Sequence, residues 1–367
     1  MRLGALLILA VTVVLTTHPE AHSAPLDEIR RILSEDALVP PAPAALEILD
    51  MAGLPELLKQ IDPYARYFTA REYRSPTTRR EGWLGIGAEL IVRGDEIFLA
   101  VYKGGAADTA GVPDRSKLLQ VDGKSVARLE PLAVAVLLKG DEGSVVRLTL
   151  DLPDGRQSAV AVVRTSFKPL DVELVPPSER QVLRIREFVA GMTKPALQAT
   201  IDFFARNEAS PNESLIIDLR DAGGGDLYEA FDVAGLFLPQ GTLLGTIQTR
   251  GGEVREVRAS SGKKYFMPVV FIVGPDTASS AEIFAGALHQ QGRAKLVGQR
   301  TYGKCSSQVE INLSDGSVLR YTNRDVVLPG GSSCSGAGLV PDREVSDELL
   351  RDLLLLVREV DSLSGTE

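Results

Sequence analysis

The stretch MPVVFIVGPDTASSAEIFAGAL, Met267–Leu288, decides the fold class of this 367-residue chain. It opens with the continuous apolar run 267–274, which is typical of a strand covered on both faces of a parallel sheet. After Ala281 the apolar residues recur at helical spacing. The run Ser214–Leu219 has the same apolar character, and a helical pattern follows each run. Residues 166–345 are therefore predicted to form an α/β core built from βαβ crossovers.

Two adjacent serines lie between the predicted strand and the predicted helix. Ser279, followed three residues later by Glu282, fits the capping box that marks the start of a helix. A serine at this place also lies beside free backbone N–H groups and the positive end of the helix dipole, which stabilise an oxyanion. One of these two serines is therefore either a helix cap alone or a cap and a nucleophile.

A serine nucleophile needs a base, and the histidines of this chain are badly placed for that role. His18 and His22 belong to a predicted export signal that is removed from the mature chain. His289 lies just past the helix that follows Ser279, about ten residues or ~15 Å along its axis. The histidines therefore argue against a Ser-His-Asp site.

Lys304 is the remaining candidate base. A lysine must be neutral to accept a proton, so burial has to lower its pKa from about 10.4. Lys304, Ser306 and Gln308 share one face of a strand-like run, so the Gln308 amide can orient the lysine amine without adding charge. The alternative for Lys304 is a solvated surface lysine, the usual fate of this residue type.

Three glycines, Gly223–Gly225, follow the buried run 214–219 and supply a third element. Glycine allows backbone N–H groups to come close to a ligand, and such a turn can supply oxyanion donors. A plain flexible turn would have the same composition, so the glycines alone do not decide between these two interpretations.

In this order the three elements resemble the C-terminal processing peptidases, also called tail-specific proteases. In that family the serine of a T-A-S-A-S-E-like motif precedes the catalytic lysine of an F-G-K-G motif by 25 residues, which is the interval between Ser279 and Lys304. A glutamine four residues after the lysine completes the family's catalytic group, and Gln308 matches it. The resemblance implies that these three residues are catalytic.

The same resemblance extends to the glycine segment. The family's D-L-R-x-N-P-G-G motif aligns with Asp218–Arg220 and with the glycine pair that follows. This alignment implies an oxyanion hole made by the backbone N–H of Gly224 or Gly225 together with that of Ser280.

Residues 82–165 change to short β-rich runs separated by Gly and Asp turns. The motifs WLGIGAEL, GGAADTAGV and LLQVDGKSV in this region look like the PDZ domain of the same family. The loop that captures a C-terminal carboxylate is matched by Leu84, Gly85, Ile86 and Gly87. The resemblance thus implies a protein or peptide substrate with a free C-terminus, and it leaves open an activating partner or a homo-oligomer.

Several positions depart from the family pattern. The usual Gly-Asp of the PDZ turn is Arg115–Ser116, and the usual Gly after the lysine is Cys305. The Asn-Pro before the glycines is Ala222–Gly223, and the second serine of the serine motif is Ala281. These changes bear on turn geometry and substrate preference more than on the reaction.

The remaining segments complete the expected organisation: a signal peptide, 1–23, a helical N-terminal segment, 24–80, and a C-terminal helix, 346–367. The signal peptide is predicted from Arg2, from an apolar core too short to span a bilayer, and from small residues before Ala24. It indicates an exported protein, periplasmic or secreted, and its retention would leave a membrane-associated form.

The charge and the cysteine and histidine content of the chain argue against nucleic-acid binding and against a metal site. The net charge is -9 and no basic stripe is present, which argues against a nucleic-acid partner. Two cysteines and one mature-chain histidine are too few for a metal site, and the resemblance implies no cofactor. Cys305 and Cys334 are expected either to form a disulfide in an oxidising compartment or to remain free thiols.

The sequence therefore predicts a crotonase/ClpP-like α/β protease core with an inserted PDZ domain and a helical N-terminal segment. The predicted function is that of an exported serine endopeptidase. One alternative is a catalytically inactive PDZ scaffold that binds peptides on the same core. Another is a crotonase-like small-molecule enzyme, which shares the core but does not explain the PDZ-like domain or the export signal.

Overall fold

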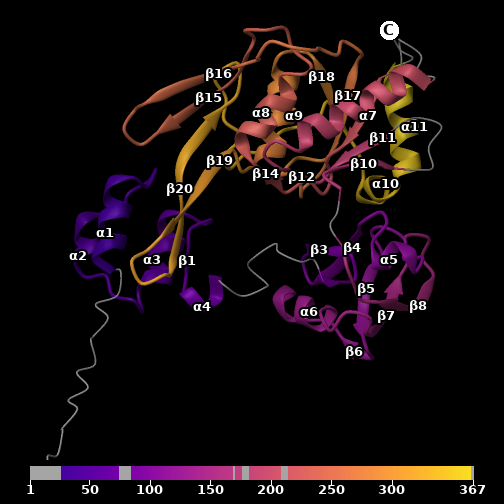
Figure 1. Ribbon diagram of the computed structural model, residues 1–367, viewed down its shortest axis with the longest axis horizontal. Coiled ribbons are helices and arrows are strands. Elements are labelled where there is room, and N and C mark those ends of the chain that lie inside the picture. Colours follow the sequence, from indigo (N-terminus) through magenta and orange to yellow (C-terminus); the bar gives the residue numbers. More distant parts are fainter. Residues whose placement is uncertain (1–25, 74–83, 168–169, 176–181, 208–213, 365–367) are drawn as a thin grey trace, which may run out of the picture.

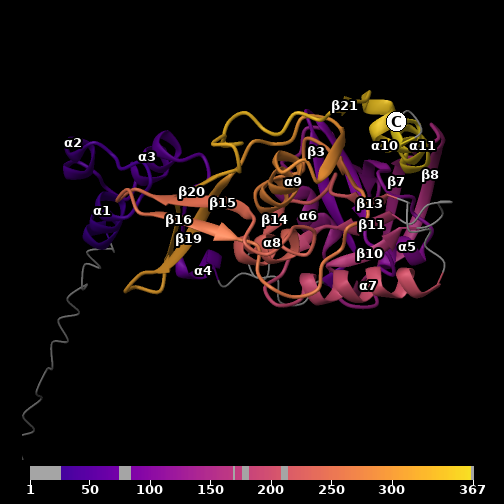
Figure 2. The ribbon, with the colours of Figure 1, turned by 90° about the horizontal axis from the view of Figure 1, so that it is seen from above.

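The computed structural model describes residues 26–73, 84–167, 170–175, 182–207 and 214–364. The predicted signal peptide lies outside these ranges. Figure 1 shows an α/β core and a smaller domain, residues 84–166, below it. Figures 1 and 2 both show a group of N-terminal helices at the end of a long β arm. Within the described ranges, no helix has the length and apolar character needed to cross a membrane.

A six-stranded sheet forms the centre of the core. In spatial order its strands are β10 (Val172–Val175), β11 (Val182–Ile185), β13 (Leu215–Asp218), β17 (Val269–Val273), β18 (Ala294–Gly298) and β21 (Arg343–Glu344). All neighbouring strands run parallel except β10 with β11. The predicted α/β fold class is thus confirmed.

Both faces of this sheet are covered, which explains the continuous apolar runs. Along β17, Val269, Phe271 and Val273 pack with the layer made by α7 (Thr193–Asn207), α8 (Leu227–Ala234) and α9 (Ser280–Gln290). The alternate residues Val270 and Ile272 pack with the C-terminal helices on the opposite face. The central strands β11, β13 and β17 therefore bury every side chain, on one face or the other.

The C-terminal segment differs from the single helix predicted from Ser346. It forms two helices, α10 (Asp347–Arg351) and α11 (Leu353–Ser364). The break falls at Asp352, whose backbone is extended and whose carboxylate accepts the N–H of Leu355 at 3.1 Å. Asp352 thus caps a new helix, which is a common role for aspartate and explains why the chain does not continue as one helix.

The PDZ domain has its own core and closes on itself. Its main sheet has the order β3 (Ala88–Arg93), β4 (Glu96–Val101), β5 (Lys117–Val121), β7 (Val145–Asp151) and β8 (Gln157–Val163), with β6 (Lys124–Ser125) on β5. Two short helices, α5 (Ala106–Thr109) and α6 (Pro131–Leu138), cover it. At the entry and exit of the domain, β2 (Leu84–Gly85) pairs with β9 (Thr165–Ser166). This pairing brings both ends of the domain together, as an inserted domain requires.

The N-terminal segment packs on a β arm that extends from the core (Figure 1). The segment contains α1 (Leu26–Glu35), α2 (Pro43–Glu47), α3 (Leu54–Ile61), β1 (Arg66–Phe68) and α4 (Ala70–Tyr73). The arm sheet adds β15 (Leu243–Thr249), β16 (Val254–Arg258), β19 (Ser306–Asn312) and β20 (Val318–Val327). Apolar side chains of the helices bury Leu319 and Tyr321 of the arm.

Buried charges join the PDZ domain to the core. Arg184 of β11 donates to Asp218 of the core and to Asp114 of the PDZ domain, each at 2.9 Å. Burial alone would raise the pKa of Asp218, but the guanidinium groups of Arg220 and Arg184 outweigh it and hold that pKa well below its usual range. The carboxylate therefore stays charged in the interior, where its pairing with arginine offsets the cost of burial.

Candidate active site

Ser279 has a backbone conformation that serine rarely adopts. It lies at the N-terminus of α9 with φ 57° and ψ -125°, a region normally left to glycine. A non-glycine residue in such a conformation costs about 1–3 kcal/mol and persists only where its surroundings enforce it. Strain of this kind is concentrated at functional sites, so it favours a nucleophile over a simple helix cap.

The glycine segment lies directly against Ser279. Gly224 and Gly225 form the short strand β14, which pairs with β12 (Glu187–Phe188). A Cβ on Gly224 would lie 2.7 Å from the Ser279 Cβ and 3.0 Å from the Ser280 backbone nitrogen. The close approach predicted for an oxyanion segment is therefore present, and Ser280 reinforces it by donating its hydroxyl to the Gly225 carbonyl at 2.9 Å.

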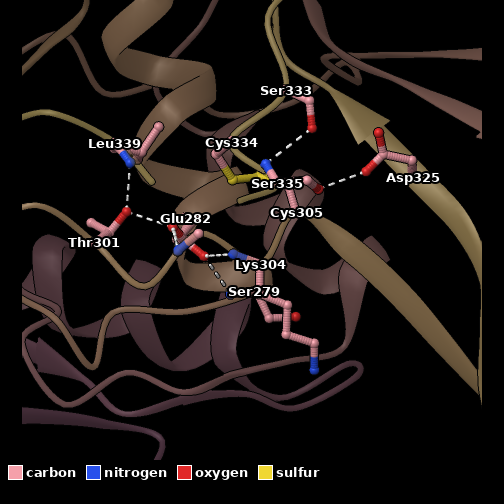
Figure 3. Close-up of a disulfide and its surroundings, with 11 residues drawn as sticks. Ser279, Glu282, Thr301, Lys304, Cys305, Asp325, Ser333, Cys334, Ser335 and Leu339 are labelled. Atoms are coloured by element: carbon pink, nitrogen blue, oxygen red, sulfur yellow. Dashed lines mark hydrogen bonds between the residues drawn. A yellow bond between two sulfur atoms is a disulfide. The ribbon is translucent and has the colours of Figure 1, made fainter. Parts of the chain in front are cut away.

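Glu282 links the serine to the segment that carries the lysine (Figure 3). Its side chain is fully buried. One carboxylate oxygen accepts the backbone N–H groups of Ser279 at 3.0 Å and Lys304 at 2.7 Å. The other accepts the N–H of Gly303 at 2.8 Å and the hydroxyl of Thr301. A single carboxylate therefore fixes the two candidate catalytic residues relative to each other.

The sequence prediction assigned Glu282 a capping role only. The structure contains the bond from the Ser279 N–H that belongs to a capping box. The three bonds to Thr301, Gly303 and Lys304 were missed, because they join positions about twenty residues apart. A charged residue among apolar positions on a buried helix was the signal that more than capping was involved.

Lys304 is partly buried, and its amine lies over an aromatic ring. The Nζ atom lies 4.6 Å from the ring centroid of Tyr64, a residue of the N-terminal segment whose contact with the site was not predicted. Burial and the nearby Arg320 guanidinium lower the pKa of Lys304, while Asp62 and Glu282 oppose this change. The lowered pKa increases the fraction of neutral amine, which a general base requires.

Two of the expected contacts of Lys304 are not formed. Among the described residues, no hydrogen bond joins its Nζ to the Ser279 hydroxyl or to Gln308. The Gln308 amide instead donates to Ser306 at 3.1 Å and to Thr322 at 2.9 Å. Gln308 does share a strand face with Ser306, but its role in orienting the lysine remains a prediction.

His289 lies away from these groups. It belongs to the last turn of α9 rather than following the helix, and it pairs with Asp342 at 3.1 Å. In the part of the chain that the structure describes, no group of three His, Cys, Asp or Glu side chains is arranged to hold a metal ion.

A disulfide joins Cys305, which directly follows the candidate base, to Cys334 (Figure 3). Their Cα atoms are 5.3 Å apart, within the range that a disulfide requires. Both residues are buried in the main core cluster. The two sequence alternatives, a disulfide or two free thiols, are thus decided in this structure for the disulfide.

A cavity of about 300 Å³ leads from the PDZ domain to the glycine segment. One wall is residues 89–92 of β3, and another is Gly223–Gly225. The predicted carboxylate loop, 84–87, lies at the start of β3, which is an edge strand of the PDZ sheet. The cavity therefore lies between a strand of the PDZ domain and the glycine segment that packs against Ser279.

Residues 181–345 match the model of peptidase family S41, and residues 97–151 match that of a PDZ domain. The chain thus contains one segment similar to S41 peptidases and another similar to PDZ domains. Its relatives include proteins named as C-terminal processing proteases, the family whose motifs the sequence resembles.

Among these relatives is a protein of Staphylococcus haemolyticus named "Probable CtpA-like serine protease", 28% identical over 81% of this chain and 60% of its own length. Another is the carboxy-terminal processing protease CtpA of Bacillus subtilis, 28% identical over 76% of this chain and 60% of its own length. The chain thus spans about 60% of the length of the curated relatives it matches.

Two solved structures share the fold. The photosystem II D1 C-terminal processing protease has a TM-score of 0.64 at 24% identity, covering 91% of this chain and 95% of that one. A Bacteroides fragilis protein named "Putative S41 protease" has a TM-score of 0.68 at 16% identity, covering 93% of this chain and 97% of that one.

The glycine segment gives a sharp test of the site. A Cβ on Gly225 would lie 2.3 Å from the Phe188 carbonyl oxygen, and its φ of 129° disfavours any side chain. We expect Gly225→Ala to displace the segment and to lower the rate at which a fluorophosphonate labels Ser279 by about 100-fold. The control is Gly223→Ala, where a Cβ meets nothing within 4 Å. Equal labelling of both variants would contradict the assigned oxyanion segment.

Proposed function

We propose that this protein is a serine endopeptidase that cleaves protein substrates recognised by their C-terminal tails. The observation that carries the proposal is the strained Ser279, with Gly224 against its side chain and with Glu282 tying its backbone to that of Lys304. The family supports the same reaction class. We further propose that the protein is exported to the periplasm or secreted.

In the proposed mechanism the neutral amine of Lys304 removes the proton of the Ser279 hydroxyl. The alkoxide attacks the scissile carbonyl, and the tetrahedral oxyanion accepts hydrogen bonds from the backbone N–H of Ser280 and of Gly224 or Gly225. The protonated lysine then donates its proton to the leaving amine. A water molecule, deprotonated by the same lysine, releases the acyl group and regenerates the hydroxyl.

This mechanism requires a movement of Lys304. Its amine lies over the Tyr64 ring, and a ring face favours the charged ammonium form. Rotation of the lysine side chain towards Ser279 would remove that contact and favour the neutral form. Substrate that fills the cavity and excludes water would promote the same change, because desolvation penalises the ammonium.

The assignment of the nucleophile is tested by two adjacent variants. We expect Ser279→Ala to abolish fluorophosphonate labelling and to lower peptide hydrolysis by about 10³-fold or more. Ser280→Ala keeps the backbone N–H and loses only the hydroxyl that bonds to Gly225, so it should retain much of the activity. If wild type and Ser279→Ala hydrolyse peptides equally, the peptidase function is wrong, and an inactive PDZ scaffold becomes the better interpretation.

The pH dependence tests the base. Because burial and Arg320 lower the pKa of Lys304, activity should rise with pH through an apparent pKa below the 10.5 of a free lysine. Lys304→Ala should lower kcat by about 10²–10⁴-fold and remove this rise. Lys304→Arg should be inactive, since a guanidinium keeps its proton. A rise with pH that persists unchanged in Lys304→Ala would assign the base to another group.

The PDZ domain is expected to select free C-termini. Amidation of a peptide substrate removes the carboxylate that the loop 84–87 would bind, so KM should rise while kcat changes little. The comparison needs one peptide in two forms, with the same scissile bond and either a free or an amidated end. Identical kcat/KM values for the two forms would show that this domain recognises something else.

A further inference from the structure

We propose that the Cys305–Cys334 disulfide is a positioning element for the lysine base, so that the peptidase becomes fully active only after these two thiols are oxidised. The inference rests on the proposed peptidase function and adds a chemical condition to it. Its starting point is a departure from the motif that the chain resembles: Cys305 follows Lys304 at the place where that motif has glycine.

The disulfide belongs to a packed contact between two backbone segments. The Gly336 N–H donates to the Gly303 carbonyl at 2.8 Å, directly before Lys304, and the disulfide makes its link directly after Lys304. Further along, the Leu339 N–H donates to the Thr301 hydroxyl at 2.7 Å. The base is therefore bracketed on both sides by links to the loop 334–339.

The two segments are closely packed against each other. A Cβ on Gly338 would lie 2.3 Å from the Thr301 carbonyl oxygen, and one on Gly303 would lie 3.0 Å from the Gly338 nitrogen. Cys305 is 0% exposed and Cys334 is 2% exposed. Neither sulfur can move outward without displacing one of the two segments.

Reduction forces such a displacement. Bonded sulfurs are about 2.05 Å apart, whereas non-bonded heavy atoms need roughly 3.5–4.0 Å. The two thiols must therefore separate by about 1.5 Å in a region with the density of a crystal. On one side, the Cys305 carbonyl accepts the Val326 N–H at the start of the β19–β20 pairing, so this side is held.

The other side is the loop 334–339, which lies outside the named helices and strands. Its backbone has positive φ at Gly336 and Gly338. Movement of this loop would stretch the hydrogen bond from the Gly336 N–H to the Gly303 carbonyl. The backbone before Lys304 would then lose its link to the loop. Ser335 and Gly336 of this loop line a mostly apolar cavity of about 340 Å³. Tyr64 and Gly303 line the same cavity. Reduction would thus disturb the amine's surroundings as well as its backbone.

The oxidation is a thiol–disulfide exchange with a disulfide oxidant, either a protein or a small molecule. One cysteine thiolate attacks the oxidant to form a mixed disulfide and releases one thiol. The second cysteine thiolate then attacks its partner sulfur and releases the other thiol. The oxidant accepts two electrons, and the two protons lost by the cysteines are balanced by those of the two released thiols.

The burial of both sulfur atoms indicates whether the disulfide is a reversible redox switch or forms once, during maturation of the protein. Exchange requires access of a thiolate to a sulfur atom, and both sulfurs are shielded once the bond has formed. The geometry therefore favours a bond that forms during folding and then resists reduction. A chain folded in a reducing compartment would remain poorly active until it met an oxidant, which fits the proposed export.

The experiment compares oxidised full-length wild type with the same protein refolded in dithiothreitol, with free thiols counted in each. We expect the reduced form to keep its far-UV circular dichroism but to lose about tenfold to 100-fold in kcat, because a displacement near 1 Å at a catalytic group has effects of this size. KM for a peptide should change little, the apparent pKa of the pH profile should shift, and oxidised glutathione should restore both.

Cys305→Ala/Cys334→Ala provides the control and replaces the reduced form should that form not fold. It should be slower than oxidised wild type and insensitive to dithiothreitol. Equal kcat and pH profiles in oxidised and reduced wild type, wild-type kcat in the double variant, or two free thiols in active protein would each overturn the inference. Failure of oxidised wild type itself to cleave peptides or to react with a fluorophosphonate would refute the proposed peptidase function, and this inference with it.

Discussion

The candidate site depends on one buried carboxylate. An unpaired carboxylate in the interior would cost many kcal/mol, so Glu282 is tolerated there only because four donors surround it. Those donors come from both sides of the site: the strained Ser279 on one, and the segment ending at Lys304 on the other. The four hydrogen bonds that stabilise the Glu282 carboxylate therefore also align Ser279 with Lys304. The same bonds hold Ser279 in its strained backbone conformation.

The parallel sheet explains why three distant segments meet. Strands β13, β17 and β18 are neighbours and run in the same direction, so the segments that follow them leave from one edge. These segments carry Gly224–Gly225, Ser279 and Lys304, respectively. The candidate nucleophile, the candidate base and the proposed backbone donors are thus assembled by topology. The local geometry comes from Glu282 and from glycines whose missing side chains permit close approach.

The sequence predicted what depends on local pattern and missed what depends on distant contacts. The apolar runs, the Ser279–Lys304 interval and the PDZ motifs were sufficient for the fold class and for the similarity to S41 peptidases and PDZ domains. The contact of Tyr64 with the Lys304 amine, the three distant bonds of Glu282 and the packing of the N-terminal helices on the β arm join residues far apart in the chain. The break at Asp352 was also missed, because an aspartate within an amphipathic pattern is as compatible with an exposed helical face as with a cap.

The departure at the PDZ turn has a physical rationale that connects the domain to the site. Arg115 stands where the family usually has glycine, and it keeps a backbone φ of 62° that glycine would adopt without strain. Its guanidinium pairs with Asp221, two residues before the glycine segment, and both side chains are almost fully buried. This conformation costs about 1–3 kcal/mol. It brings the guanidinium into a buried charge pair, whose disruption would leave an uncompensated carboxylate. Because this pair joins the PDZ turn to the strand end that leads into Gly224, a shift of the domain cannot leave the oxyanion segment unaffected.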